Sequence, residues 1–232
     1  RARAVKDPQE RELMRRASQL NDQALAELRP FIRDGVREWE LADQIQRIYK
    51  ELGADGVSFP PLVAFGGNAG SGHHWPDGTR LRPGDCVLVD AGCTFEGYCS
   101  DMTRTWFYQD VTPEQQAVYD LVLRANQQAE AAVRPGVPLR ELDSAARDII
   151  AAAGFGPHFT HRLGHFIGLE DHEFGDVSAS SQDAAVPGNI FSIEPGVYLE
   201  GKLGVRIEDL VLVTEEGCEV LNRLPKELEV IA

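Results

Sequence analysis

Apolar residues recur at helical spacing in four stretches of the chain, and these stretches form two pairs. The first pair covers residues 8–28 and 38–52, and the second covers residues 113–133 and 140–153. A polar capping residue followed by proline starts the first and third stretches, and a glycine directly follows the second and fourth. The pattern therefore predicts four helices arranged as two helix pairs.

Apolar runs with few charges follow each helix pair and predict strands. We expect strands at residues 59–65, 86–91 and 100–108 in the first half, and at 190–198 and 204–214 in the second. A Gly-rich reversal separates 86–91 from 100–108, so these two strands are expected to form a hairpin. A Pro-Gly pair interrupts the strand at 190–198.

The two helix pairs resemble each other in sequence, with identical residues recurring 101 positions further on. The matched residues are Gly35, Val36, Glu40, Leu41, Ile48 and Gly53, with counterparts at Gly136, Val137, Glu141, Leu142, Ile149 and Gly154. We interpret this pattern as an internal duplication, which predicts two similar halves facing each other across a pseudo-two-fold cleft. No low-complexity segment or linker interrupts the chain, so we expect a single domain over residues 1–232.

Composition narrows the possible partners. The 232 residues include 37 acidic and 23 basic side chains, a net charge of −14, which argues against a module that binds nucleic acid through a basic surface. The longest apolar stretch, 149–155, is too short to span a membrane, so no membrane partner is expected. The four cysteines show no C-x-x-C spacing and fit a reducing compartment, which predicts a cytoplasmic location.

Four acidic residues interrupt or end the apolar strands, where a carboxylate is costly unless it is paired or bound to a metal. They are Asp90, Asp101, Glu194 and Glu208. If the two halves close as predicted, all four approach one point, and one or two divalent cations would compensate their charge. The alternative is that each acid is bonded separately to Arg104, Arg206 or Lys202.

Histidines form a second cluster, because four of the six fall within fifteen positions. These are His158, His161, His165 and His172. Glycines flank them, which is typical of a functional loop. Mixed carboxylate and imidazole ligands suit Mn, Fe, Co or Zn. The other two, His73 and His74, follow a Gly-rich loop at 66–72 that lacks the Lys-Ser/Thr ending of a phosphate-binding loop.

With these motifs the chain resembles the pita-bread metallopeptidases, the family that includes methionine aminopeptidase, aminopeptidase P and prolidase. The resemblance implies an α+β pita-bread fold: two pseudo-two-fold-related halves with a curved, mostly antiparallel sheet flanked by helices. It also implies two divalent metal ions, manganese first with cobalt or zinc as alternatives. The five metal ligands of the family fall on Asp90, Asp101, His165, Glu194 and Glu208.

The resemblance is closest to the proline-specific branch. The Thr-His-Arg-Leu-Gly-His motif at 160–165, the spacing between His165 and His172, and the Gly-Val-Arg-Ile-Glu motif at 204–208 are similar to prolidase and aminopeptidase P. This implies an exopeptidase that hydrolyses the Xaa-Pro bond of small peptides with proline in the second position, with prolidase favoured over aminopeptidase P. The alternatives are a methionine-aminopeptidase-like exopeptidase and a pita-bread module that binds peptides without cleaving them.

The same resemblance assigns roles to individual side chains. Glu194 would shuttle the proton in catalysis, and His73 and His172 would bind the substrate and stabilise the oxyanion. His161 would line the proline pocket, and Arg206 would hold a bridging carboxylate. A structural role for His161 and an ordinary salt bridge for Arg206 remain open alternatives.

The chain differs from the family pattern in two respects. Phe166 stands where relatives commonly have glycine, which suggests a narrower floor of the site. Proline-specific relatives usually carry an N-terminal domain, so residues 1–6 are expected to be a linker from such a domain, ahead of one catalytic domain. The resemblance also implies a homodimer.

Overall fold

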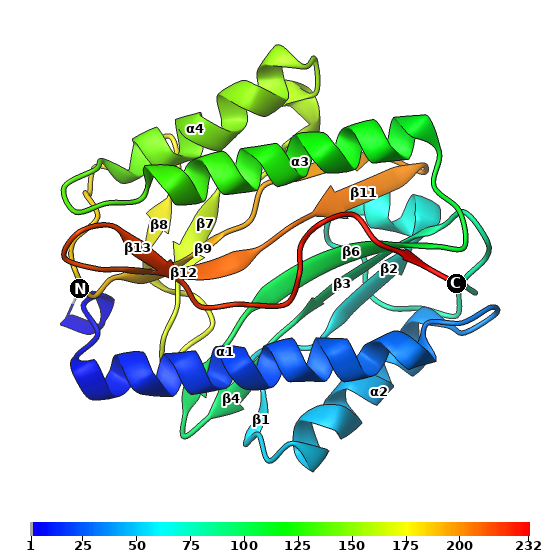
Figure 1. Ribbon diagram of the computed structural model, residues 1–232, viewed down its shortest axis with the longest axis horizontal. Coiled ribbons are helices and arrows are strands. Elements are labelled where there is room, and N and C mark those ends of the chain that lie inside the picture. The colour runs from blue at the N-terminus through cyan, green and yellow to red at the C-terminus, as the bar shows by residue number, and fades with distance from the viewer. Residues whose placement is uncertain (1) are drawn as a thin grey trace.

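Two pairs of helices enclose the strands in the computed structural model, which describes residues 2–232 (Figure 1). On one side lie α1 (Pro8–Leu28) and α2 (Glu38–Glu51), and on the other lie α3 (Pro113–Ala132) and α4 (Leu139–Ala152). All four helices predicted from the apolar spacing are present, and their ends agree with the predicted ends to within one residue.

Capping boxes start α1 and α3. Asp7 accepts hydrogen bonds from the backbone N–H of Gln9 and Glu10 at 2.8 and 2.9 Å, and the Glu10 carboxylate accepts one from the Asp7 N–H at 2.7 Å. Thr112 and Gln115 make the same reciprocal pair at the start of α3. Caps of this kind are worth about 1 kcal/mol each, so both helix starts are determined locally.

The strands form two main sheets and two small ones. The first main sheet has the order β14 (Val230–Ile231), β6 (Met102–Tyr108), β3 (Cys86–Ala91) and β2 (Leu62–Phe65). The second has the order β13 (Cys218–Val220), β12 (Asp209–Val213), β9 (Ile190–Ile193), β7 (Gly164–Phe166) and β8 (Glu173–Val177). The small sheets are β1 (Gly56–Val57) with β4 (Cys93–Phe95) and β5 (Tyr98–Cys99), and β10 (Gly196–Leu199) with β11 (Leu203–Arg206). Every pairing is antiparallel except β14 with β6.

The predicted hairpin is confirmed, because β3 and β6 pair with Asp90 opposite Thr103. Several strand predictions were wrong in extent. The strand expected at 100–108 begins at Met102, and the one expected at 190–198 is divided between β9 and β10, which lie in different sheets. The strand expected at 59–65 begins only at Leu62. The run expected as one strand at 204–214 is divided between β11 and β12, which lie in different sheets. Ile207 is buried and apolar, so nothing in the local pattern marks the break that leaves Glu208 between the two strands.

Equivalent backbone contacts support the predicted duplication. The Gly35 N–H donates to the Leu81 carbonyl at 3.0 Å, and 101 residues further on the Gly136 N–H donates to the Ala185 carbonyl at 2.8 Å. Both glycines have positive φ, 70° and 82°, a backbone conformation that disfavours other residues.

A matching Pro-Gly-Asx turn precedes β3 and β9. In the first, the Asp85 carboxylate accepts a hydrogen bond from the Arg82 N–H at 2.9 Å. In the second, the Asn189 side-chain oxygen accepts one from the Val186 N–H, also at 2.9 Å. The two turns therefore start equivalent strands in the two halves.

Two large hydrophobic clusters hold the helix pairs against the sheets, and the cluster under α3 and α4 also includes first-half residues such as Leu88 and Phe107. The cluster under α1 and α2 contains Leu25 and Ile45 together with Val87 of β3. The cluster under α3 and α4 contains Val122 together with Phe191 of β9. Burial of such side chains is worth about 1.5–3 kcal/mol each, so the helix pairs are held against the sheets mainly by apolar contact. Within residues 2–232, no helix combines the length and apolar character needed to cross a membrane.

Candidate metal centre and substrate cleft

The five side chains predicted as metal ligands line one cleft of about 470 Å³ between the two halves. Each comes from a strand or the end of one. Asp90 lies near the end of β3, Asp101 precedes β6, His165 lies in β7, Glu194 follows β9, and Glu208 lies between β11 and β12. The structure thus brings together residues that are up to 118 positions apart in the sequence.

The donor atoms face one another at short range. His165 Nε2 lies 3.4 Å from Asp101 Oδ2 and 3.5 Å from Glu194 Oε1. One ligand atom each from Asp101, His165 and Glu208 lie within 4.8 Å of one another, and all three residues are buried. A cation in this space would be surrounded by oxygen and nitrogen donors.

Several of these carboxylate oxygens lack partners. Asp90 Oδ1, Asp101 Oδ1 and Glu208 Oε1 are buried without a hydrogen bond from any described residue. Buried polar atoms are nearly always satisfied, so three orphaned oxygens among the predicted ligands indicate that a positive group belongs here.

The hydrogen bonding of His165 points the same way. Its Nδ1 lies 3.2 Å from the Phe166 carbonyl, which can only accept, so Nδ1 carries the proton and Nε2 presents a lone pair. That lone pair faces the carboxylate oxygens of Asp101 and Glu194. Burial, with the neighbouring His172 ring, lowers the pKa of His165 to about 3, so a second proton is not the bridging group. A metal-binding histidine characteristically donates its other N–H to a backbone carbonyl in this way.

The carboxylates repel one another in the metal-free protein. Burial, and then the charges of neighbouring acids, raises the pKa of both Asp101 and Glu208 well above the ordinary range. Burial raises the pKa of Glu194 to about 7, although Arg206 opposes the shift. Among the described residues only Asp90 of the four acids has an arginine or lysine partner, since Arg104 pairs with Asp209 instead. The residues present therefore fit a centre that holds divalent cations.

Arg206 organises one side of the centre. Its Nη2 donates to Asp90 Oδ2 at 2.6 Å, its Nε to Thr103 Oγ1 at 3.0 Å, and its Nη1 to the Tyr198 hydroxyl at 2.8 Å. The Thr103 hydroxyl in turn donates to Glu208 Oε2 at 2.6 Å. Arg206 thus orients Asp90 directly and Glu208 through Thr103, a residue that the sequence motifs did not single out.

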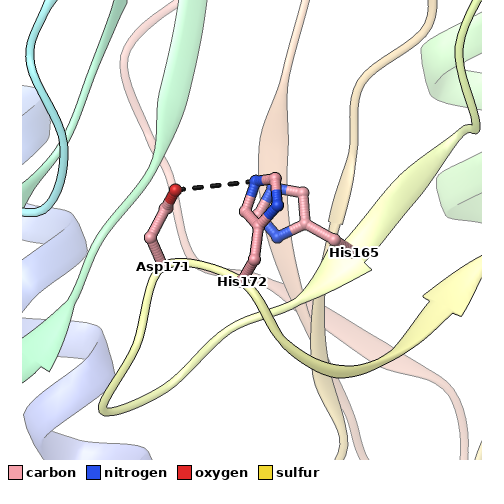
Figure 2. A group of neighbouring side chains, drawn as sticks. All are labelled: His165, Asp171 and His172. Carbon is pink, nitrogen blue, oxygen red and sulfur yellow. Dashed lines mark ion pairs between the residues drawn. The ribbon is translucent and has the colours of Figure 1, made fainter.

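His172 lies over His165 at the mouth of the centre. Figure 2 shows the two rings close together and the Asp171 carboxylate directed at His172. The ring centroids are 3.8 Å apart. Arg162 Nη2 lies 3.3 Å from His172 Nδ1 and can only donate, so the His172 proton is on Nε2, 3.5 Å from Asp171 Oδ2. His172 therefore presents an N–H toward the cleft.

Asp171 is a cleft residue that the sequence reasoning missed. Its Oδ1 is buried without a partner, and burial together with Asp90 raises its pKa to about 7. Ligand atoms of Asp171, His165 and His172 also lie within 4.8 Å of one another. In the sequence Asp171 lies between an acidic residue and His172. An acid next to a histidine is common on protein surfaces, so this position alone does not indicate a site.

The other two histidines predicted to contact the substrate, His73 and His161, differ in how their side chains are held. His73 lines the cleft, whereas the neighbouring His74 turns away from it. His161 has both ring nitrogens engaged, with Nδ1 2.7 Å from the Arg162 carbonyl and Nε2 2.7 Å from the Tyr198 hydroxyl. Burial, with Arg206 nearby, lowers the pKa of His161 to about 3, so it is a neutral ring that can offer only its face and edge to a ligand.

The apolar wall of the cleft comes from Phe59, Pro60 and Trp75, the last of them 72% exposed.

The suggestion that Phe166 narrows the floor was wrong. Phe166 is buried in the core, where it packs on Phe191 with centroids 5.5 Å apart, and it does not line the cleft. Gly175 makes room for it, because a Cβ at this position would lie 2.9 Å from the Phe166 ring.

A second cluster of acids and histidine has a different character. The buried Glu38 carboxylate lies 2.7 Å from His74 Nε2 and accepts hydrogen bonds from Asn68 and from the backbone N–H of Phe65 and Asp77 at 2.8–3.0 Å. Both oxygens of Glu38 are therefore satisfied inside the protein. This cluster anchors the loop that carries His73 and has no orphaned oxygen for a cation.

The fold and the donor set define a protein with a carboxylate and histidine site suited to divalent cations, and comparison with known proteins gives the family. Residues 12–215 match the model of metallopeptidase family M24. This stretch is well over half of the chain, and the chain belongs to that family.

Several relatives resemble it over nearly its full length. The chain is 41% identical over 224 residues to an uncharacterized peptidase of Staphylococcus aureus (strain USA300), covering 97% of this chain and 64% of that protein. An X-Pro aminopeptidase from Thermotoga maritima MSB8 superposes with a TM-score of 0.97 at 37% identity, covering 99% of this chain and 65% of the other. An Xaa-Pro dipeptidase from Bacillus anthracis gives a TM-score of 0.97 at 36% identity, covering 99% and 64%.

These matches confirm the α+β pita-bread fold expected from the sequence motifs. The chain spans just under two thirds of the length of these relatives.

Proposed function

We propose that this chain is the catalytic part of a metallo-exopeptidase that hydrolyses the Xaa-Pro bond of small peptides. The observation that carries the proposal is the lone pair of His165 Nε2 facing carboxylate oxygens in a cleft where three further oxygens of the predicted ligands have no partner. A divalent cation would satisfy all of these atoms at once.

The five residues would hold two divalent cations, with manganese expected first and cobalt or zinc as alternatives. By resemblance to the family, Asp101 and Glu208 would contribute to holding both ions, Asp90 to holding one of them, and His165 with Glu194 to holding the other. Cations bound there lower the pKa of a water molecule and polarise the scissile carbonyl.

Glu194 would move the proton. Its Oε1 accepts a hydrogen bond from the Ser192 hydroxyl at 3.0 Å, and Ser192 also accepts one from the His165 N–H at 3.0 Å, so the carboxylate is held against the metal centre. Glu194 would take the proton from the attacking water and pass it to the leaving nitrogen.

Two histidines would bind the substrate. His73 comes from the loop after β2, and His172 from the segment between β7 and β8, so they approach the cleft from different halves. With its Nδ1 occupied by Arg162, His172 has its Nε2 N–H available as a donor to the oxyanion that forms at the scissile carbonyl.

Proline after the scissile bond makes a tertiary amide without an N–H, so its recognition depends on the ring. The face of His161 and the apolar wall formed by Phe59, Pro60 and Trp75 offer contacts for a pyrrolidine ring. Because His161 uses both nitrogens internally, its contribution to proline binding would be packing and not hydrogen bonding.

Hydrolysis of Ala-Pro, Ala-Pro-Ala and Met-Ala with Mn or Co tests the proposal. Cleavage of the dipeptide alone identifies a prolidase, which we favour, and cleavage of the tripeptide alone identifies an aminopeptidase P. Preferential cleavage of Met-Ala supports the methionine-aminopeptidase-like alternative. Full activity after exhaustive chelation contradicts a metal-dependent mechanism. Bound metal without turnover of any of the three peptides supports the binding-module alternative.

Three expectations from the sequence stay predictions: a homodimer, a cytoplasmic location, and a linker at residues 1–6 ahead of a single catalytic domain. Of the linker, Arg1 lies outside the described residues, while Ala2–Ala4 form a short 3₁₀ turn. Light scattering of the purified protein measures the first and cell fractionation the second. Limited proteolysis of the full-length protein tests whether the chain is cut around residue 6 to leave an intact catalytic domain.

A further inference from the structure

Lys6, in the segment directly before α1, is buried and does not line the cleft. Its side chain is 1% exposed, and its Nζ lies 2.8 Å from Glu173 Oε2, whose side chain is 4% exposed. A buried ammonium and a buried carboxylate are each costly alone, so this pair holds its two segments together in one geometry. The two residues are 167 positions apart.

Glu173 closes the loop that carries His172. Its other oxygen, Oε1, accepts a hydrogen bond from the Leu169 N–H at 3.0 Å. The carboxylate packs so closely on Gly168 that a Cβ there would lie 2.7 Å from Oε1. One carboxylate thus ties the start of the loop, residues 168–173, to its end, and His172 is the residue directly before Glu173.

Lys6 is itself fixed at its backbone. The Lys6 N–H donates to the Gly188 carbonyl at 2.8 Å, and Arg11 Nε of α1 donates to the Lys6 carbonyl at 2.8 Å. The preceding residue, Val5, forms a bridge with Asn189. The ammonium therefore reaches Glu173 from an anchored position.

We propose that Lys6 is a positioning residue for the substrate site: by pairing with Glu173 it fixes the loop 168–173 so that His172 presents its N–H to the cleft. The inference rests on the proposed function for the role of His172. It adds a determinant of activity outside the cleft, in the segment that precedes the first long helix.

The structure provides a matched control. Arg3 Nη1 and Glu170 Oε1 form a 3.1 Å ion pair between the same N-terminal segment and the same loop, but their side chains are 56% and 66% exposed. Exposed pairs contribute little. Arg3→Met removes the same charge from the same segment as Lys6→Met without breaking a buried pair.

The test is a double-mutant cycle between Lys6 and His172 in the metal-loaded protein. We expect Lys6→Met to lower kcat/KM for the best Xaa-Pro substrate by about tenfold or more, because small displacements of a binding group are costly, while metal content stays as in wild type. In a His172→Ala background, Lys6→Met should change kcat/KM by less than about twofold, since the group that it positions is gone. Arg3→Met should match wild type.

Hydrogen exchange gives a readout that does not depend on turnover. Amides of residues 168–173 should exchange faster in Lys6→Met and in Glu173→Gln, with those of α3 unchanged. If Lys6→Met does not fold, Glu173→Gln carries the same test, because the amide keeps an oxygen for the Leu169 N–H and loses only the charge.

An equal fall in kcat/KM in both backgrounds, or a lower Tm with unchanged kcat/KM and unchanged exchange at 168–173, overturns the proposal. A wild-type protein that cleaves no peptide overturns the proposed function instead. In that case exchange at 168–173 still decides whether Lys6 positions the loop.

Discussion

Asp90 and Glu194 occupy equivalent positions in the two halves of the molecule. Each lies five residues after the last residue of a Pro-Gly-Asx turn, Asp85 in the first half and Asn189 in the second, and each stands at the end of the strand that the turn begins. The candidate metal centre is therefore assembled from both halves, and neither half contains it alone.

Metal binding should couple to the stability of the whole protein. We expect about two ions per chain by elemental analysis, and a higher Tm with Mn than after chelation, because bound cations remove the repulsion among the buried acids. Glu208→Gln should lower the bound metal and the Tm increment. Asp77→Asn, in the satisfied cluster around Glu38, is the control and should leave both unchanged. Equal Tm values with and without metal contradict the coupling.

The affinity for metal should fall as the pH falls below 7. In the metal-free protein Glu194 has a pKa of about 7, so below that pH it holds a proton that must leave when a cation binds. Each released proton weakens binding about tenfold per pH unit. His165, with a pKa of about 3, adds no competition above pH 5.

The same raised pKa predicts the stability of the chelated protein. The free energy that protonated Glu194 contributes to stability is fully present below the ordinary glutamate pKa of 4.5. It is lost as the pH rises through 7, because the unfolded chain gives up this proton at lower pH than the folded protein does. The Tm increment due to Mn should therefore grow from pH 6 to pH 8. Calorimetric titrations in two buffers of different ionisation enthalpy measure the protons released. A Tm increment that does not depend on pH, with no proton released on metal binding, contradicts the raised pKa of Glu194.

Glu194→Gln should abolish turnover without unfolding the protein. The amide keeps the size of the side chain and an oxygen for the Ser192 hydroxyl, but it cannot shuttle a proton. We expect kcat to fall roughly 10²–10⁴-fold, with circular dichroism as in wild type. Glu216→Gln, an exposed change of the same kind in the turn after β12, should retain full activity. Substantial turnover by Glu194→Gln would show that another group moves the proton.

Arg206→Met should destabilise the chelated protein by roughly 3 kcal/mol, because it leaves the half-buried Asp90 without its partner and frees the hydroxyls of Thr103 and Tyr198. Arg206→Lys keeps the charge but not the planar fork, so it should recover only part of the loss. Urea unfolding and Mn titration measure the two effects. An Arg206→Met protein as stable as wild type would mean that Asp90 is stabilised in another way.

The sequence alone was sufficient for the four helices, for the β3–β6 hairpin and for the choice of the candidate donors. Helix starts such as the capping box at Asp7 and the period of the apolar positions depend on near neighbours, so they can be read along the chain. The acids on apolar strands were recognisable because burying a carboxylate without a partner is unfavourable. The glycines at equivalent positions of the two helix pairs, such as Gly35 and Gly136, likewise indicated the duplication from the sequence alone.

The tertiary structure decided which distant groups meet. Several features depend on residues that are distant in the sequence and that the local pattern treats as independent. They are the strand break before Glu208, the core position of Phe166 opposite Gly175, the hydrogen bond from Thr103 to Glu208, and the buried ion pair of Lys6 with Glu173. Whether a side chain points into a core or a cleft, and which partner satisfies its charge, depends on the packing of both halves. A carboxylate on a strand therefore predicted that a positive group is needed, and only the folded protein showed where Arg206 supplies one and which oxygens of the predicted ligands are left without any.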